Sequence, residues 1–189
     1  MKTTSIMIVG VGGQGTLLAS KLLGNVLIAR GYDVKLSEVH GMSQRGGSVV
    51  TYVRYGDKVY SPIVDQGEAD YILSFEILES ARWISYLKQG GVLLTNTQKT
   101  WPMPVITGAA DYPEGIVEKL SAMADVQAVD ALKLAEQAGS PKAVNVVLIG
   151  VLSKRMDIPE EAWIKAIEET VPAKFLELNK KAFRLGREA

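Results

Sequence analysis

A glycine-rich turn between an apolar strand and an amphipathic helix, near the start of the chain, constrains the fold more than any other feature. Residues 5–9 form a short apolar run of the kind found in strands buried on both faces, and apolar residues recur at helical spacing over 17–27. The turn between them, Gly10-Val-Gly-Gly-Gln-Gly15, matches G-x-G-x-x-G in the required strand-to-helix context. A second strand over 32–39 completes a Rossmann-like βαβ start, which predicts parallel strands.

The rest of the pattern predicts a three-layer α/β/α fold with a mostly parallel, mixed sheet. Residues 48–55 alternate and are rich in β-branched and aromatic side chains, Gly56-Asp57 marks a turn, and 58–61 are predicted to pair back as an inserted antiparallel hairpin. Further strands are predicted at 69–75, 91–95 and 126–129, and helices at 76–88, 115–123, 130–138, 144–154, 159–170 and 174–185. The last third is therefore helical, and no linker divides residues 1–189, so a single domain is expected.

Composition excludes several classes of function. Because 21 basic residues balance 21 acidic ones, no overall basic field draws the chain to nucleic acid or to a membrane surface, and neither is expected as a partner. The chain has no cysteine, which excludes disulfides, thiol nucleophiles and iron–sulfur clusters held by this chain alone. With a single histidine as well, no metal site is expected. The sequence shows neither a signal peptide nor a membrane span, so a cytoplasmic location is the default expectation.

The first glycine turn is the candidate cofactor-binding segment. A helix that begins beyond Gly15 presents unpaired N–H groups and the positive end of its dipole, which suit a phosphate or a carboxylate. The candidate residues are Gly10, Gly12, Gly13, Gln14, Gly15 and Thr16. Glu38 follows at about the 20-residue spacing of the ribose-binding acid of dinucleotide folds. The alternative is that the glycines only permit a tight turn and close packing of helix on sheet.

A second glycine-rich loop, His40-Gly-Met-Ser-Gln-Arg-Gly-Gly47, follows the second predicted strand. Arg45 between glycines offers bidentate hydrogen bonds to an anion, and His40 can exchange a proton near neutral pH; these two are the only catalytic candidates, although a structural role is open for both. Asn145 lies inside an apolar helix and either caps a neighbouring loop or faces the ligand. The candidates for contact with substrate or with a partner's cofactor are His40, Gln44, Arg45, Gly46, Gly47, Ser48 and Asn145. The two loops follow successive strands, which predicts one rim.

Several motifs of complete active sites are missing from the sequence. It contains no G-x-x-x-x-G-K-[ST] phosphate loop, no G-x-S-x-G elbow and no credible catalytic triad. It also lacks a Gly-Asp-Gly followed by a downstream Asn, the pattern that holds magnesium and thiamine diphosphate. The sequence therefore does not predict a self-sufficient active site.

These features together resemble the gamma-type subunits or domains of the 2-oxoacid:ferredoxin oxidoreductases. The likeness covers nearly the whole chain and rests on the first glycine turn, Gln44-Arg-Gly-Gly-Ser48, Ser61-Pro62, Asn145 with Gly150, and the final stretch from Asn179 to Gly186. His40-Gly-Met-Ser before the Arg-Gly-Gly motif is more similar to the indolepyruvate branch than to the Tyr-Gly-x-Glu-x-Arg-Gly-Gly form of pyruvate-type relatives.

The resemblance implies that the chain is one subunit of a complex. Thiamine diphosphate, Mg and 4Fe-4S clusters would lie on an alpha-type partner subunit, coenzyme A would be the cosubstrate, and ferredoxin would take the electrons. The reaction implied is oxidative decarboxylation of a small 2-oxoacid, most simply an arylpyruvate such as indolepyruvate, to an acyl-CoA, in an anaerobic metabolism. This chain would be the subunit without clusters, inactive alone, with Arg45 touching an anion and Gln44 giving a neutral hydrogen bond.

Two other interpretations stay open at this stage. One is an autonomous Rossmann-like dehydrogenase that binds a nucleotide through Glu38, against which the lack of an evident second substrate domain counts. The other is a non-catalytic interaction module of the same fold.

Overall fold

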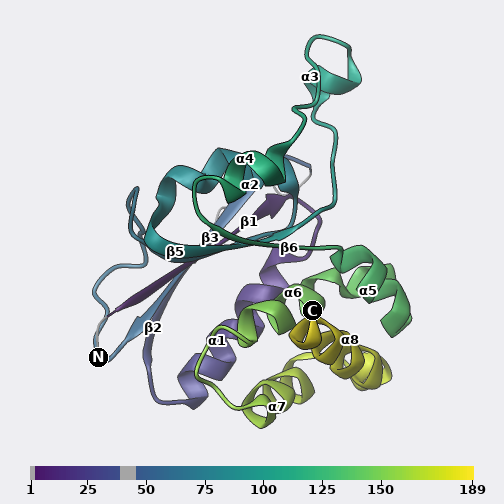
Figure 1. The fold of residues 1–189 in the computed structure, drawn as a ribbon. Coiled ribbons are helices and arrows are strands. Elements are labelled where there is room, and N and C mark those ends of the chain that lie inside the picture. Colours follow the sequence, from purple (N-terminus) through teal and green to yellow (C-terminus); the bar gives the residue numbers. More distant parts are fainter. Residues whose placement is uncertain (1–2, 39–45) are drawn as a thin grey trace.

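The computed structural model describes residues 3–38 and 46–189 (Figure 1). In chain order the strands are β1 (Thr4–Val11), β2 (Asp33–Glu38), β3 (Ser48–Gly56), β4 (Ala69–Ser74), β5 (Leu87–Asn96) and β6 (Asp125–Val129). The helices are α1 (Thr16–Ala29), α2 (Ile77–Trp83), α3 (Met103–Ile106), α4 (Ile116–Ser121), α5 (Ala131–Ala138), α6 (Val144–Ser153), α7 (Glu160–Thr170) and α8 (Leu176–Glu188). Short 3₁₀ turns follow α2 and precede α6 and α8: η2 (Ile84–Tyr86), η3 (Pro141–Ala143) and η4 (Ala173–Phe175).

The strands form one mixed sheet in the order β2-β3-β1-β4-β5-β6. Strand β3 is antiparallel to both of its neighbours, whereas β1, β4, β5 and β6 pair in parallel, so the predicted mostly parallel sheet is confirmed. The predicted hairpin is wrong in its pairing, because 58–61 form no strand. Both edges of β3 are already taken by β1 and β2, and the backbone N–H of Val59 instead donates to the Asp33 carboxylate at 2.9 Å.

Helices cover both faces of the sheet, which confirms the three-layer arrangement. Figure 1 shows α2 and α4 on one face and α1 with α5 to α8 on the other. Alternate residues of β1 belong to two separate cores: Ile6 and Ile8 pack with α1 and the C-terminal helices, while Met7 and Val9 pack under α2 and α4. Successive side chains of a strand point to opposite faces, so the apolar run of β1 reflects burial on both sides.

The helical last third is held to the rest of the domain through α6, whose ten residues are all buried. Helix α8 crosses α6 where two glycines face backbone: a Cβ on Gly150 would lie 2.2 Å from the Phe183 carbonyl oxygen, and one on Gly186 only 2.0 Å from that of Val147. The two backbones therefore approach closely, and neither glycine has room for a side chain. In the described ranges no helix combines the length and the apolar character needed to cross a membrane.

Near β5 one predicted helix end is wrong, and one segment without a predicted element forms an arm. The helix predicted over 76–88 is shorter: α2 ends at Trp83 and the 3₁₀ turn η2 ends at Tyr86, because Leu87 is extended and already pairs with Ala69 as the start of a longer β5. After β5 the chain leaves the sheet as a protruding arm, residues 97–115, which carries α3 at its tip and returns to α4 (Figure 1).

Candidate functional site

The turn between β1 and α1 is shaped by its glycines in two different ways. A Cβ on Gly10 would lie 2.8 Å from the Gln14 side-chain oxygen and 2.9 Å from the Phe75 Cβ, so this glycine permits close packing. Gly13 and Gly15 have φ values of +100° and +87°, which disfavour any other residue. Gly15 is the N-cap of α1, and no side chain of the described residues caps the helix there. The first N–H groups of α1 are therefore available to an anion.

The side chain of Gln14 braces this turn from inside. Its oxygen accepts a hydrogen bond from the backbone N–H of Val11 at 2.8 Å, and its amide nitrogen donates to the Phe75 carbonyl at 3.5 Å. Among the predicted cofactor residues, Gln14 is thus occupied in holding the loop, while Gly12, Gly13, Gly15 and Thr16 line open space.

Asn145 ties α6 to the same turn across 130 residues of sequence. Its amide nitrogen donates to the Gly15 carbonyl at 3.4 Å, and its oxygen accepts from the Val146 N–H at 2.9 Å. A Cβ on Gly15 would lie 2.6 Å from this amide nitrogen, so the contact itself requires glycine. The structure shows that Asn145 holds a neighbouring loop, and because Asn145 also lines the larger hollow described below, its contact with a ligand stays a prediction.

The two glycine-rich loops meet. The backbone N–H of Gly12 donates to the Gly47 carbonyl at 2.8 Å, which joins the end of the second loop to the middle of the first. Next to it, the Ser48 hydroxyl donates to the buried carboxylate of Glu79 on α2. The prediction of one rim is confirmed for the parts of both loops that are described. His40, Gln44 and Arg45 lie outside the described residues.

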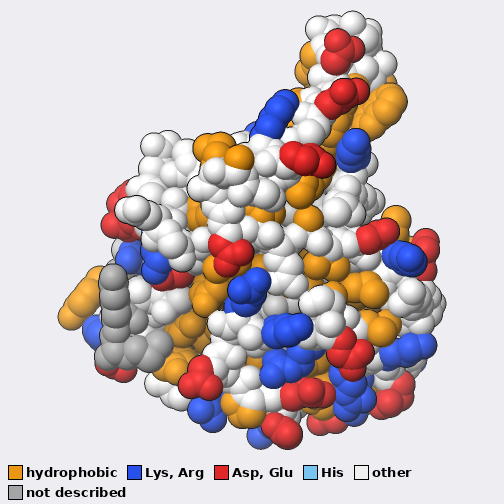
Figure 2. All heavy atoms as spheres, viewed as in Figure 1, with side chains coloured by type: hydrophobic (Ala, Val, Ile, Leu, Met, Phe, Trp, Pro, Cys, Tyr) orange, Lys and Arg blue, Asp and Glu red, His pale blue; other side chains and the backbone are white. Residues whose placement is uncertain are grey.

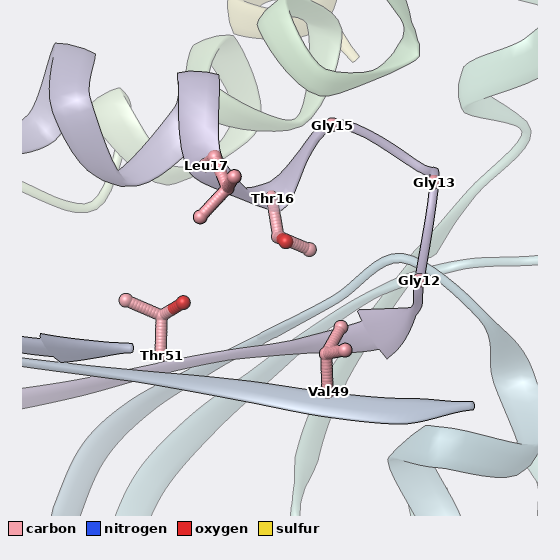
Figure 3. A pocket seen from close by; sticks show the side chains of 7 residues that line it. All are labelled: Gly12, Gly13, Gly15, Thr16, Leu17, Val49 and Thr51. Atoms are coloured by element: carbon pink, nitrogen blue, oxygen red, sulfur yellow. The ribbon is translucent and has the colours of Figure 1, made fainter. Parts of the chain in front are cut away.

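A hollow of about 310 Å³ opens between the first loop and β3. Figure 3 shows the side chains of Thr16 and Leu17 on the helix side of the gap, across from Val49 and Thr51 on the strand side. The backbone of Gly12, Gly13 and Gly15 forms the end wall. The helix and strand sides thus offer apolar surface and hydroxyl groups. The end wall offers backbone at the positive end of α1.

A second hollow of about 450 Å³ lies on the other side of the loop. It is lined by Gly13, Gln14, Gly15, Gln98, Leu132, Pro141, Lys142, Val144 and Asn145. Lys142 brings a positive charge to the lining of this hollow, which also includes the backbone of Gly13. The glycine loop is therefore a ridge that a ligand or a partner segment can approach from two sides.

The position of Glu38 does not support the dinucleotide alternative. In that fold the acidic residue ends the strand next to the glycine turn. Here β3 lies between β1 and β2, which moves Glu38 two strands away, at about 4.8 Å per strand. Its carboxylate also accepts a hydrogen bond from the Ser20 hydroxyl on α1 at 2.6 Å. The carboxylate therefore braces α1 against the edge strand.

Sequence reasoning missed three residues that shape this site: Thr51, Glu79 and Lys142. Thr51 fits the alternation of a strand with no sign that it faces a hollow, and Lys142 resembles any surface cation next to a proline. The carboxylate of Glu79 is only 3% exposed, although its place in a predicted amphipathic helix gave no sign of burial. In the fold, the Ser48 hydroxyl and the Trp83 indole N–H both donate to this carboxylate.

Comparison with known proteins places the chain in a family. The family model described as pyruvate ferredoxin/flavodoxin oxidoreductase matches residues 5–189. The chain belongs to this family. It is 47% identical to the indolepyruvate oxidoreductase subunit IorB of Thermococcus kodakarensis, over 100% of this chain and 96% of the relative.

Solved structures agree in fold. The pyruvate oxidoreductase subunit PORC of Thermotoga maritima matches with a TM-score of 0.78 at 25% identity, over 100% of this chain and 97% of that one. A 2-oxoglutarate:ferredoxin oxidoreductase of Magnetococcus marinus, solved with 2-oxoglutarate, coenzyme A and succinyl-CoA bound, matches with a TM-score of 0.75 at 18% identity, over 100% of this chain but 31% of that one. There the same fold is one part of a longer polypeptide. The expected gamma-type subunit of an oxidoreductase is thereby confirmed.

The residues present fit some groups of such an enzyme and not others. Iron–sulfur clusters are held by cysteine thiolates, and the chain has no cysteine. Within residues 3–38 and 46–189, no three His, Cys, Asp or Glu side chains are grouped as metal ligands. An anionic group fits the rim better, because the uncapped start of α1 and the backbone of Gly13 face the two hollows.

Proposed function

We propose that this chain is the subunit without clusters of an indolepyruvate-type 2-oxoacid:ferredoxin oxidoreductase, and that its joined glycine rim completes the reaction pocket of the complex. The observation that carries the proposal is the hydrogen bond between the two loops, Gly12 to Gly47, which presents both as one edge with an open hollow on each side. Such an edge suits contact with a ligand held mainly by another subunit. The likeness to IorB supports the choice of indolepyruvate as substrate.

The bound groups of the complex belong, in this proposal, to an alpha-type partner. Thiamine diphosphate with Mg would supply the decarboxylation chemistry, and 4Fe-4S clusters would pass electrons to ferredoxin. The absence of cysteine from this chain supports that division. Coenzyme A is proposed as the cosubstrate, since a structural neighbour was solved with it bound. Because reduced ferredoxin and coenzyme A are used in the cytoplasm, the complex is placed there.

The chain's own part is to bind and orient anionic groups. The start of α1, with the backbone of Gly13 and Gly15 and the Thr16 hydroxyl, would hold a phosphate of coenzyme A or the carboxylate of the 2-oxoacid. Arg45 would hold the same class of anion through its planar guanidinium, and Gln44 would give a neutral hydrogen bond. His40 would act as the proton-exchanging neighbour of that anion. Gly46, Gly47 and Ser48 would carry these side chains to the rim.

Activity of the assembled complex tests the proposal. The tagged chain is purified without oxygen from its native host, and the complex is assayed for iron, thiamine diphosphate and indolepyruvate-dependent reduction of a viologen dye. Arg45→Ala should raise one KM at least tenfold, and the KM affected, for coenzyme A or for the 2-oxoacid, identifies the anion. Arg30→Ala, at an exposed position after α1, is the matched control and should leave both KM values unchanged.

Three outcomes would contradict parts of the proposal. If the purified complex contains neither thiamine diphosphate nor iron, the proposed role as a subunit of this oxidoreductase is wrong. Turnover of pyruvate in preference to indolepyruvate removes the substrate assignment alone. Nucleotide binding by the isolated chain, abolished by Glu38→Ala, would revive the dehydrogenase alternative.

A further inference from the structure

Asn96, the last residue of β5, carries a polar side chain that is fully buried. An amide inside the core requires partners for both its oxygen and its nitrogen. Its oxygen accepts a hydrogen bond from the Ala131 N–H at 3.2 Å, and its nitrogen donates to the Phe75 carbonyl at 3.2 Å and to the Gln98 side-chain oxygen at 3.3 Å. One side chain therefore joins the ends of β4 and β5 to the start of α5.

The Phe75 residue that Asn96 holds also supports the first glycine turn. The side-chain amide of Gln14 donates to the same Phe75 carbonyl, at 3.5 Å. The Phe75 N–H donates to the Val9 carbonyl at 2.9 Å, and a Cβ on Gly10 would lie 2.9 Å from the Phe75 Cβ. Because these contacts are close-packed, a shift of Phe75 must move the turn as well.

The other two partners of Asn96 adjoin the hollow of about 450 Å³ beside the glycine turn. Gln98 lines this hollow, and so does Leu132, which directly follows Ala131 at the start of α5. Residues 13–15 of the glycine turn belong to the same lining. Asn96 thus connects two parts of one hollow, the turn through the end of β4 and the start of α5 by a direct hydrogen bond.

An anion at this hollow depends on local geometry, because the protein surface supplies little long-range attraction. Figure 2 shows acidic and basic side chains mixed over the face in view, and the 21 basic residues of the chain balance its 21 acidic ones. Backbone N–H groups at a helix start hold an anion only when they point at it from hydrogen-bond distance. The spacing between the glycine turn and the lining with Gln98 and Lys142 therefore decides how well an anion is held.

We propose that Asn96 is a positioning residue for the anion held at the glycine rim; this inference rests on the proposed function. Asn96 has no exposed surface, so it acts on a ligand only through the residues that it holds. It fixes the turn through Phe75, and it fixes the remaining lining through Gln98 and the start of α5. An amide suits this role because it donates and accepts at once, which neither a carboxylate nor an aliphatic side chain does.

Kinetics of the assembled complex test this role with two variants of Asn96. Asn96→Asp keeps the shape and the acceptor for the Ala131 N–H, but a carboxylate cannot donate to the Phe75 carbonyl. Asn96→Ala removes the amide without adding a charge. In both, one KM, for coenzyme A or for the 2-oxoacid, should rise at least fivefold, while kcat changes less than twofold. A weaker hold on a ligand in both the ground state and the transition state raises KM alone.

Thr95→Val is the matched control. Thr95 precedes Asn96 in β5 and is 1% exposed, but its hydroxyl shares a hydrogen bond of 2.6 Å with that of Ser80 on α2, on the opposite face of the sheet. Valine has the same shape without the hydroxyl. This variant should lose stability in urea denaturation and leave both KM values within twofold of the wild type. The comparison separates the loss of any buried hydrogen bond from the loss of those that Asn96 makes.

Hydrogen exchange of the full chain gives a second readout that does not depend on the reaction. In Asn96→Ala, the backbone N–H groups of residues 12–16 and 131–132 should exchange faster, while those of α8 stay unchanged. In Thr95→Val, exchange should quicken in α2 instead. A local change at the turn and at the start of α5 shows that Asn96 holds both in place.

Each other result overturns the inference in a distinguishable way. Unchanged KM values of both Asn96 variants in an active complex remove the positioning role and leave the proposed function intact. An equal rise of KM in Thr95→Val, faster exchange throughout the domain, or failure of both Asn96 variants to fold assigns Asn96 to the stability of the domain alone. A wild-type complex without the oxidoreductase activity removes the proposed function, and this inference with it, before any variant is made.

Discussion

On the face of the sheet that carries α1 and α5 to α8, α6 is buried throughout and α8 crosses it at Gly150 and Gly186. On the opposite face, α2 places two carboxylates, Glu76 and Glu79, beneath the surface, and each accepts hydrogen bonds from distant parts of the chain. The first face is joined mainly by apolar contact and shape, whereas the second adds directed polar contacts of buried carboxylates to a smaller apolar core.

The two faces therefore contribute differently, one mainly to stability and the other to the positions of particular segments. Apolar packing has no direction and grows with the area buried, so the large helical layer supplies most of the stability. Buried carboxylates add little net stability but fix geometry, since each oxygen requires donors at set positions. Glu79 fixes Ser48 at the glycine rim, and Glu76 fixes the arm. The polar face therefore positions the start of β3, next to the second glycine loop, and the base of the arm.

The sharpest test of the apolar face is Gly186→Ala. Its Cβ would lie 2.0 Å from the Val147 carbonyl oxygen, so the helices must separate, and we expect unfolding free energy to fall by about 3 kcal/mol or more. Gly24→Ala is the matched control, because only the Leu36 side chain lies near, at 4.0 Å, and a helical alanine should stabilise by about 0.5–1 kcal/mol. Urea denaturation measures both; equal effects of the two variants would refute the packing argument.

Glu79→Ala tests the polar face at the rim. Loss of the carboxylate leaves the Ser48 hydroxyl and the Trp83 indole N–H without their acceptor, which should cost about 2 kcal/mol. Because Ser48 directly follows the second glycine loop, activity of the complex should fall as well. Glu79→Gln keeps an acceptor oxygen and should retain most of the stability and most of the activity. If alanine lowers stability but leaves the KM values and kcat unchanged, Glu79 does not position the rim.

Tyr112→Phe tests the polar face at the arm. It removes one donor from Glu76, and the returning leg should open more often, at a cost of about 1 kcal/mol. Hydrogen exchange should quicken over 97–115 and stay unchanged in α6. Tyr60→Phe, at an 88% exposed residue, is the control and should leave hydrogen exchange unchanged both over 97–115 and in α6. Faster exchange throughout the domain would mean that Glu76 supports the whole fold.

Tyr55 makes the stability of the domain sensitive to alkali, with no effect expected at neutral pH. Burial raises the pKa of Tyr55 to about 12 from an ordinary 10.0, because the charged phenolate is disfavoured in the apolar core. The folded state keeps the proton longer than the unfolded state, so stability is fully present below pH 10 and falls as pH rises from 10 to 12. Tyr55→Phe should flatten this fall in denaturation curves; an unchanged slope would assign it to other groups.

The parts of the fold that the sequence predicted are those encoded by neighbouring residues. The apolar run of β1 and the G-x-G-x-x-G turn predicted the strand, the turn and the helix start, and all three are confirmed. The placement of β3 between β1 and β2 was not predicted, because pairing of distant strands leaves no mark on either. Asn145 was recognised as a buried polar residue in need of a partner, but its partner, Gly15, emerged only from the fold.

By itself the sequence determined the family, the α/β class and the absence of thiolate ligands, since motifs, periodicity and composition are local or additive properties. Only the tertiary structure decided that Gly12 and Gly47 are the residues that join the two glycine loops, that Glu38 accepts a hydrogen bond from Ser20, and that Trp101 and Met103 stand exposed on a braced arm. The physical reason is that burial and hydrogen-bond partners depend on which distant segments meet, and the chain must fold before they do.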